Sequence, residues 1–358
     1  MVQATPIKVM QINSMKIWRG GEVHVFLLCQ QLISIGVSTV LACRSGSPID
    51  QKAKDANIPV FNLPLKNTID FKSAWMLADY CRKNSIDIIH AHNGRDYWLA
   101  GLAKFFNPKL KVVITRHILG PLKNTILHRW LYKKVDQVLA VSETVKNAIT
   151  LIPPEKIAVV YNGIDTEEFA AAPAGTLRQE LDLAATTKIV GMVGKVHPSK
   201  GHRTLLQSIP QILTECPDTV FIVVGSGDSV QLQQMNSDVL FLGERNNVPE
   251  IMKDLDVFVM ASRNEPFGLV TLEAMAAGAT IVGANSGGTA EIIVDGETGL
   301  LFPPDDSARL AQAVIRILTD SKFDGKLREN GSNAVHKYTI VNMAANTKKI
   351  YQDVLGRG

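Results

Sequence analysis

The sequence has few cysteines, no long apolar run and no leader-like start. Its four cysteines, Cys29, Cys43, Cys81 and Cys216, show no Cys-x-x-Cys or other metal-like spacing. This usage indicates reduced, buried thiols and not a disulfide framework. No window approaches ~18 uninterrupted apolar residues, and residues 1–6 lack a basic segment followed by an apolar one. We therefore expect a cytoplasmic protein that is neither secreted nor membrane-spanning.

Motifs for several common chemistries are also missing. The first strand-to-helix turn lacks Gly-x-Gly-x-x-Gly, which argues against a nicotinamide dehydrogenase. No Asp-x-Asp lies in a suitable loop, and no histidines or cysteines cluster at ligand spacing, so we predict no metal and no bound cofactor. The basic residues are dispersed and lack the interleaved aromatics of single-strand binders, which argues against nucleic acid as a partner.

Negative charge is scarce in the first half of the chain. Residues 1–165 contain 21 of the 38 Lys and Arg but 11 of the 34 Asp and Glu, hence +10, which leaves 17 against 23 and −6 for the remainder. The first half is therefore expected to face an anionic neighbour.

What the sequence does contain is an alternation of short β-branched apolar runs with helical patterns. A chain of 358 residues exceeds one typical core. The alternation predicts an α/β protein with two doubly wound, Rossmann-like domains. The expected strands are Ile7–Ile12, Val37–Cys43, Val60–Leu63, Ile86–His90, Val112–Thr115, Gln137–Val141 and Ile157–Tyr161, then Ile189–Val193, Val220–Val224, Val239–Leu242, Asp256–Met260, Thr280–Val282 and Gly299–Phe302.

The domain boundary is expected near a turn at residues 162–165 and a small, Pro- and Gly-containing stretch at 170–175. The first domain then covers residues 1–165 and the second covers 166–338. Residues 339–358, with a helix around Ile340 to Val354, are expected to cross back onto the first domain.

Two glutamates in the second half stand eight residues apart, Glu265 and Glu273. They flank a loop and helix start that follow the apolar strand at 256–260, and the helix continues to Gly278. Free N–H groups at a helix start favour a phosphate, while carboxylates accept hydrogen bonds from sugar hydroxyls. Exposed glutamates are the alternative interpretation. The Pro266–Gly268 linker between them favours a grip on a nucleotide-sugar.

Glycine-rich loops follow other strands. Gly20 and Gly21 precede a helical run at 22–33, where paired glycines let backbone amides approach a diphosphate closely, although a simple connector explains them equally well. After the first strand of the second domain, a loop from Gly194 to Gly201 carries Lys195 and Lys200. Ligands bind at this edge of open α/β sheets, and a bound anion would offset the unfavourable position of Lys200 at a helix start.

Histidines end two strands of the first domain. His90 and His92 close one, and Arg116 with His117 closes another. A lone histidine is more often structural than catalytic, but His117 at a carboxyl edge is a site candidate.

The segment 120–134 combines apolar residues and a tryptophan with basic side chains. Two interpretations stay open: the segment lies on an anionic leaflet, or it packs its apolar stripe on the sheet and exposes its lysines. A peripheral location on the inner face of the cytoplasmic membrane follows from the first interpretation.

With these residues, the chain resembles the retaining glycosyltransferases of family 4, with the two-domain GT-B fold, of the bacterial lipopolysaccharide and cell-envelope type. The resemblance covers nearly the whole chain. Its most specific part is the pair Glu265 and Glu273, supported by Gly20–Glu22 and by Gly287–Glu291 ahead of Asp295–Leu300.

The resemblance implies a metal-independent hexosyltransferase that uses a UDP- or GDP-type sugar. Glu273 would hold the donor ribose, and Glu265 would lie at the donor hexose. Lys200 matches the lysine that braces the leaving diphosphate, whereas Lys195 replaces the usual arginine and lacks its bidentate geometry. His117 resembles the histidine near the donor sugar. The further donor-binding residues implied are Gly20, Gly21, Gly194, Gly225, Arg245, Phe267, Gly268, Leu269 and Val270.

The acceptor implied is a hydroxyl of a cell-envelope glycan or a lipid-linked sugar, and a soluble small molecule is the alternative. A nucleotide-sugar 2-epimerase shares this architecture but is expected to lack the Glu265–Glu273 element. A non-catalytic nucleotide-sugar-binding protein is the remaining alternative, because Lys195 departs from the pattern.

Overall fold

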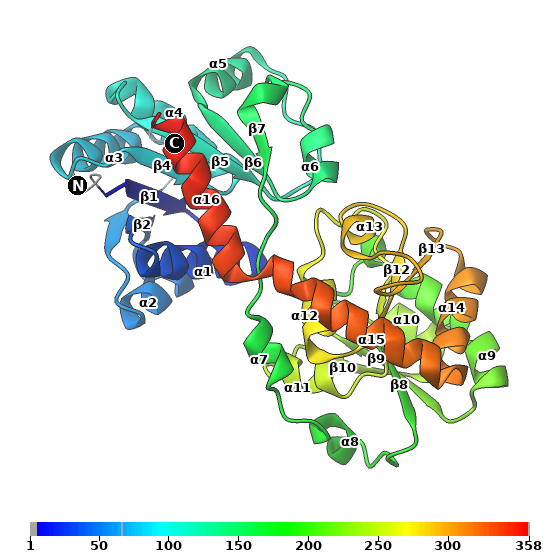
Figure 1. Cartoon of the computed structure of the whole chain (residues 1–358). Coiled ribbons are helices and arrows are strands. Elements are labelled where there is room, and N and C mark those ends of the chain that lie inside the picture. Colours follow the sequence, from blue (N-terminus) through cyan, green and yellow to red (C-terminus); the bar gives the residue numbers. More distant parts are fainter. Residues whose placement is uncertain (1–5, 66, 357–358) are drawn as a thin grey trace. The chain divides into compact units, whose positions relative to one another are not determined.

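The computed structural model describes residues 6–65 and 67–356. The chain divides into two compact units, Met1–Gly163 with Ile340–Gly358, and Ile164–Thr339. Each unit is built on its own parallel sheet, flanked by helices (Figure 1). Among the described residues, no helix combines the length and apolar character that a membrane crossing requires.

The first unit contains a sheet with the strand order β3-β2-β1-β4-β5-β6-β7. Its strands are β1 (Lys8–Asn13), β2 (Ser38–Arg44), β3 (Val60–Leu63), β4 (Ile88–Ala91), β5 (Lys111–Arg116), β6 (Gln137–Ala140) and β7 (Ile157–Val159). Its helices are α1 (Gly20–Ser34), α2 (Pro48–Asp55), α3 (Phe71–Lys83), α4 (Gly94–Phe106), α5 (Ile126–Lys134), α6 (Glu143–Asn147), the 3₁₀ turn η1 (Pro154–Lys156) and α16 (Ile340–Val354).

The second unit contains a sheet with the order β10-β9-β8-β11-β12-β13. Its strands are β8 (Lys188–Val193), β9 (Thr219–Val224), β10 (Val239–Gly243), β11 (Val257–Met260), β12 (Thr280–Ala284) and β13 (Leu300–Phe302). Its helices are α7 (Thr166–Ala170), α8 (Thr176–Glu180), α9 (His202–Glu215), α10 (Val230–Met235), α11 (Val248–Lys253), α12 (Leu269–Ala277), α13 (Thr289–Ile292), α14 (Ser307–Thr319) and α15 (Ser321–Val335), with η2 (Pro198–Lys200) and η3 (His336–Tyr338).

The predicted fold class is confirmed: both sheets are parallel and doubly wound, and every expected strand is present within two residues of its predicted bounds. The strands are apolar along nearly their whole length because helices cover both faces of such a sheet. In β11, for example, all four residues are buried. In the second unit, the hydrophobic core packs the strands of the sheet against α9 and α14.

The last helix, α16, belongs to the first unit and lies along α1 (Figure 1). Met343, Ala344 and Tyr351 of α16 are buried with Val9 of β1 and Leu28 of α1. Tyr351 also makes polar contacts at the centre of the sheet. Its hydroxyl accepts a 2.9 Å hydrogen bond from Nε2 of Gln11 and lies 2.7 Å from Nδ1 of His90.

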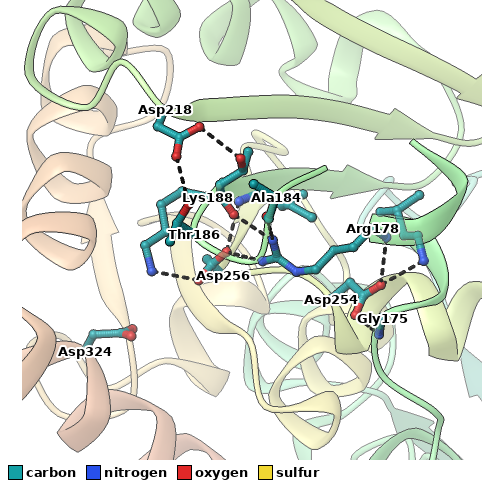
Figure 2. A network of polar contacts seen from close by, with 12 residues as sticks. Gly175, Arg178, Ala184, Thr186, Lys188, Asp218, Asp254, Asp256 and Asp324 are labelled. Carbon is teal, nitrogen blue, oxygen red and sulfur yellow. Dashed lines mark hydrogen bonds and ion pairs between the residues drawn. The ribbon is translucent and has the colours of Figure 1, made fainter. Parts of the chain in front are cut away.

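Two carboxylates, those of buried Asp254 and half-buried Asp256, stabilise the start of the second unit (Figure 2). Asp254 accepts hydrogen bonds from the backbone N–H of Gly175, Leu177 and Arg178, at the beginning of α8. Asp256 accepts from the guanidinium of Arg178 at 3.0 Å and from Nζ of Lys188 at 3.2 Å. The first turn of α8 therefore receives an acceptor for its free N–H groups and a negative charge that suits a helix N-terminus.

The segment 120–134 is helical only from Ile126. Thr125 caps this helix, α5, through a hydrogen bond from the backbone N–H of His128. Leu131 and Tyr132 are buried, whereas Ile126 is 84% exposed and Leu127 is 57% exposed. The apolar residues therefore divide between the core and the surface, and neither of the two interpretations of this segment describes all of them.

Candidate active site

The carboxyl edge of the second sheet gathers most of the predicted donor residues. Strands β8 and β11 are neighbours although they are not consecutive, and their crossovers leave in opposite directions. Ligands of open α/β sheets bind in the crevice at such a switch point. Gly194 and Lys195 follow β8, and the segment Ala261–Gly268 follows β11.

The structure brings together Lys200 and Glu265, 65 residues apart in the chain, as an ion pair. Nζ of Lys200 lies 2.7 Å from Oε2 of Glu265, and the side chains are 32% and 15% exposed. Lys200 ends η2, directly before Gly201, and Glu265 lies in the loop ahead of α12. A cation and a carboxylate at one point suit a ligand that presents both phosphate oxygens and hydroxyl donors.

Glycines allow the loops at this edge to approach one another closely. A Cβ atom on Gly225, which has φ of +148°, would lie 2.0 Å from the carbonyl oxygen of Gly194. A Cβ on Gly287 would lie 2.4 Å from the carbonyl oxygen of Glu265, and one on Gly288 equally close to Cα of Phe267. Gly288 N–H also donates to the Glu265 carbonyl at 2.8 Å. No side chain beyond hydrogen fits at these positions.

Helix α12 begins where the Glu265 loop ends. Gly268 is its N-cap residue, with φ of +105°. Because glycine has no side chain, the cap supplies no oxygen to the first N–H groups of the helix. The helix positions Leu269 and Val270, half-buried, in its first turn, where backbone N–H groups have no partner within the helix. Phe267 is buried and contacts the ring of Tyr338 edge-on at 5.7 Å. The loop therefore holds the helix start in a fixed place, available to an anion.

Glu273 lies one turn from the start of α12 and is half-buried. Burial and, to a smaller extent, the neighbouring carboxylate of Glu168 together raise the pKa of its carboxyl from the ordinary 4.5 to about 7. Among the described residues no lysine or arginine pairs with this half-buried carboxyl, which is therefore poised to accept hydrogen bonds from a polyol.

Two predicted donor residues have other surroundings. Lys195 is exposed in the loop after β8. Arg245 forms an ion pair with Glu180 of α8. A hollow of about 270 Å³ in this unit is lined by Val196, His197, Pro198, His202, Arg203, Asp228, Gln231 and Leu232, none of which the sequence had singled out for a role.

The remaining predicted residues, Gly20, Gly21 and His117, lie in the first unit. Its switch point falls between β1 and β4. A hollow of about 190 Å³ there is lined by Gly21 and His117, together with Asn13, Met15, Glu22, His92, Asn93, Gly94, Tyr97, Arg116 and Ile118. Gly20 begins α1 and is exposed.

Four histidines of the first unit form a cluster. The ring of His24 lies 4.6 Å from that of His117 and 5.5 Å from that of His92, and His92 lies 4.2 Å from His90. Burial lowers the pKa of His117 to about 4 and that of His90 to about 3, so both rings are neutral at pH 7. Oriented neutral rings can donate or accept one hydrogen bond at each nitrogen.

Part of this cluster also offers nitrogen ligands. Within the described ranges, His24, His92 and His117 are the group whose ligand atoms lie close enough to hold a metal ion, all within 4.8 Å of one another. The sequence had indicated no metal ligands here because the three residues are far apart in the chain. Metal independence stays a prediction.

In the first unit, sequence reasoning left His24, Glu22 and Asp96 without a role. His24 lies in the second turn of α1 and is buried. Burial raises the pKa of Asp96 to about 7, and its carboxylate accepts the backbone N–H of Ser14 at 3.4 Å. A usable signal existed for His92, since it lies two residues after His90 at the end of β4, and residues two apart in an extended chain share a face.

Both units match known sequence families. Residues 18–168 match the family described as Glycosyltransferase Family 4, and residues 187–320 match Glycosyl transferases group 1.

Curated relatives and a solved structure agree with these matches. The chain is 30% identical to N-acetyl-alpha-D-glucosaminyl L-malate synthase of Bacillus anthracis over 80% of each chain. It is 26% identical to UDP-Gal:alpha-D-GlcNAc-diphosphoundecaprenol alpha-1,3-galactosyltransferase of Escherichia coli over 88% of this chain and 89% of that one. The structure of Anabaena HepE in complex with UDP is similar in fold, with a TM-score of 0.85 at 20% identity over 97% of this chain and all of that one. The chain belongs to the family 4 glycosyltransferases, with the GT-B fold.

Proposed function

We propose that this glycosyltransferase is a retaining, metal-independent enzyme that moves a hexose from a UDP- or GDP-sugar to a hydroxyl of a cell-envelope glycan or lipid-linked acceptor. The observation that supports this proposal best is the ion pair of Lys200 and Glu265 beside the start of α12. It offers a cation for phosphate and a carboxylate for sugar hydroxyls at one carboxyl edge, next to free helix N–H groups.

In the proposed reaction the bond between the anomeric carbon and the diphosphate breaks first. Lys200 and the N–H groups of Gly268 and Leu269 stabilise the negative charge that develops on the leaving diphosphate. Fixed donors aimed at developing charge are commonly the largest contribution to catalysis. Glu265 stabilises the positive charge that develops on the sugar. The acceptor hydroxyl attacks from the face of the departing diphosphate, whose oxygen takes its proton.

A carboxylate at Glu273 completes the donor site in this proposal. Its two oxygens would accept hydrogen bonds from the ribose hydroxyls, which requires the ionised form. Two observations support a nucleotide-sugar donor: the name of the Escherichia coli relative gives UDP-Gal as the donor, and HepE, which is similar in fold, was crystallised in complex with UDP.

The test is a thermal-shift screen of the chain against UDP-, GDP- and ADP-sugars, repeated with Glu273→Ala. A bound ligand raises the melting temperature by mass action. We expect a rise with one nucleotide class that the variant loses. Product formed with that donor is then examined by NMR. An inverted anomeric centre overturns the retaining mechanism, and equal rises in both proteins overturn the role of Glu273.

The membrane part of the proposal concerns α5. Ile126 and Leu127 are exposed at its start, and Arg129 and Lys133 follow on the same helix. Exposed apolar side chains beside cations suit the interface of an anionic bilayer. This supports a lipid-linked acceptor on the inner face of the cytoplasmic membrane.

The α5 proposal is tested by sedimentation with phosphatidylglycerol vesicles at low salt. We expect co-sedimentation that Ile126→Asn with Leu127→Asn abolishes, and that Phe71→Asn on α3 leaves unchanged. A chain that stays in the supernatant contradicts membrane binding and favours a soluble acceptor instead. The Bacillus anthracis relative favours this alternative, because its name, N-acetyl-alpha-D-glucosaminyl L-malate synthase, contains the small molecule malate.

A further inference from the structure

A second hollow of the first unit, here called the basic hollow, is lined by basic residues and by no acidic ones. It measures about 380 Å³ and lies between the start of α4, the segment after β5 and helix α5. Its charged and titratable lining residues are Arg95, Arg116, Lys123 and His128, with Tyr97 and Tyr132, and no aspartate or glutamate lines it.

Arg116 places a positive charge in this hollow that is nearly buried, which is energetically unfavourable without a negative partner. Its side chain lies at the end of β5 and the residue is only 8% exposed. Its guanidinium donates to the carbonyl oxygen of Gly120 and contacts the hydroxyl of Tyr97. Within residues 6–65 and 67–356, no carboxylate forms an ion pair with Arg116, Arg95 or Lys123. Arginine stays protonated when buried, and an uncompensated buried charge is expensive, so a negative counter-charge is expected at this place.

The neighbouring groups are arranged to receive that counter-charge. Carbonyl oxygens of Leu65 and Asn67 hold the guanidinium of Arg95 at 3.0 and 3.2 Å, which fixes its direction. Lys123 is exposed at the rim, where its ammonium can turn inward. The planar guanidinium of Arg116 matches an oxyanion with two N–H groups, and such charge-assisted pairs are the strong ones.

The basic hollow adjoins the hollow that contains His117. Gly94, Tyr97, Arg116 and Ile118 line both of them. An anionic group seated on Arg116 would therefore place the rest of its molecule beside His117 and Gly21, within the same unit. Its position suits the acceptor of the transfer and not a structural ion, because it shares its lining with the hollow of His117, which the family resemblance places near the donor sugar.

We propose that the basic hollow binds a phosphate or carboxylate group of the acceptor, so that the acceptor substrate is an anion. The assignment of this anion to the acceptor rests on the proposed glycosyl transfer. Binding of the anion itself can be measured without any transfer reaction. A phosphate of a lipid-linked glycan and the acidic group of a soluble molecule share this chemistry.

The test titrates inorganic phosphate into the full chain with UDP present at saturation, so that the donor site is occupied. Calorimetry then reports the anion site of the first unit. Lys123→Met removes a rim cation, Arg116→Gln removes the buried one, and Lys109→Met is the matched control on the same unit away from the hollow. Circular dichroism verifies folding, and Lys123→Met decides alone if Arg116→Gln does not fold.

We expect a loss of phosphate affinity of roughly 10–100-fold in the hollow variants, the size of a lost hydrogen bond to a charged group, and none in the control. Affinity for UDP stays unchanged in all of them. Unchanged phosphate affinity in Lys123→Met and Arg116→Gln overturns the proposal. Failure of the wild type to bind UDP contradicts the donor site instead, and leaves the phosphate titration to decide the hollow.

Two further arms identify the source of the anion. Glucose 1-phosphate replaces phosphate in one, and phosphatidylglycerol vesicles replace it in the other. Loss of binding in Lys123→Met with both ligands supports a lipid-borne phosphate as well as a soluble one. Loss with glucose 1-phosphate alone supports the hollow with a soluble acceptor, and loss with neither contradicts it.

Discussion

Lys200 and Glu265 pair across the carboxyl edge of the second sheet, with 2.7 Å between Nζ and Oε2. The pair joins the loop that follows β8 to the loop that follows β11, the two strands at the switch point. Both side chains remain partly open to solvent, at 32% and 15%. An entering ligand can therefore take hydrogen bonds from each partner without first breaking a fully buried ion pair, which would be more costly.

The first prediction concerns Lys200. We expect Lys200→Met to lower kcat roughly 10²–10³-fold, because it removes a fixed cation from the leaving diphosphate. KM for the donor changes less, since the charge develops in the transition state. The measurement is steady-state transfer with the donor that the thermal-shift screen identifies. Lys326→Met, an exposed lysine of α15, is the matched control.

Two outcomes contradict this role of Lys200. One is a variant that keeps the wild-type kcat, which would make the lysine a surface partner of Glu265 only. The other is an equal loss in the Lys326→Met control, which would point to a general effect of charge on the second unit.

The second prediction concerns Glu273 and pH. Its folded pKa, about 7, lies above the ordinary value of 4.5. The native state therefore binds the proton more tightly than the unfolded state, and this stabilisation is complete below about pH 4.5 and is lost as pH rises through about 7. Glu273→Gln does not titrate, so its melting temperature should exceed that of the wild type by about 2–4 °C at pH 8 and by less at pH 5.

Differential scanning calorimetry across pH 5–8 measures this difference, with Glu329→Gln on the exposed side of α15 as the control. A difference between Glu273→Gln and wild type that stays constant with pH would show that the Glu273 carboxyl keeps an ordinary pKa. The same variant should lose affinity for the nucleotide, so stability and binding change in opposite directions at pH 8.

Much of the candidate donor site in the second unit could be predicted from local sequence. Glu265, Gly268 and Glu273 belong to one strand-loop-helix unit, and their relation is set by the helical turn and by a glycine N-cap. The strand ends that carry Gly194 and His117 could be predicted because buried parallel strands have continuous apolar sequences. These arguments need contacts of short sequence separation only.

The parts that sequence did not predict depend on long-range contacts. His24 lies in α1, whereas His92 and His117 directly follow β4 and β5, and only the strand order places these three elements at one edge. The engagement of Arg245 by Glu180 and the link from Tyr351 to Gln11, which is 340 residues away, are of the same kind. Helix α5 differs for another reason: its pattern allowed burial or exposure, and its first turn is exposed while Leu131 is buried.

The third prediction concerns Asp256, which Figure 2 shows between Arg178 and Lys188. Its side chain is 16% exposed, and it also accepts the backbone N–H of Ile189 at 3.0 Å. Asp256→Asn leaves the guanidinium of Arg178 without its carboxylate, and we expect a loss of roughly 1–3 kcal/mol in the free energy of unfolding. Chemical denaturation of the full chain measures it, with Asp238→Asn on the exposed surface as control. A change below that of the control would mean that the network contributes no net stability.

The fourth prediction concerns the close approach of Gly225 to Gly194. Gly225 has φ of +148°, and an added Cβ would lie 2.0 Å from a backbone oxygen that has no flexible end to move away. Gly225→Ala must therefore shift the loop after β8 and the loop after β9, at a cost of about 1–3 kcal/mol for the strained backbone alone. We expect a lower melting temperature and weaker nucleotide binding together, because the loop from Gly194 to Gly201 carries both lysines.

Gly325→Ala, in open space on α15, should be neutral or slightly stabilising. Thermal unfolding with and without nucleotide measures both effects. Equal melting temperatures for the two variants would show that the loops can separate without cost, and that the glycine at 225 is not needed for the geometry of the site.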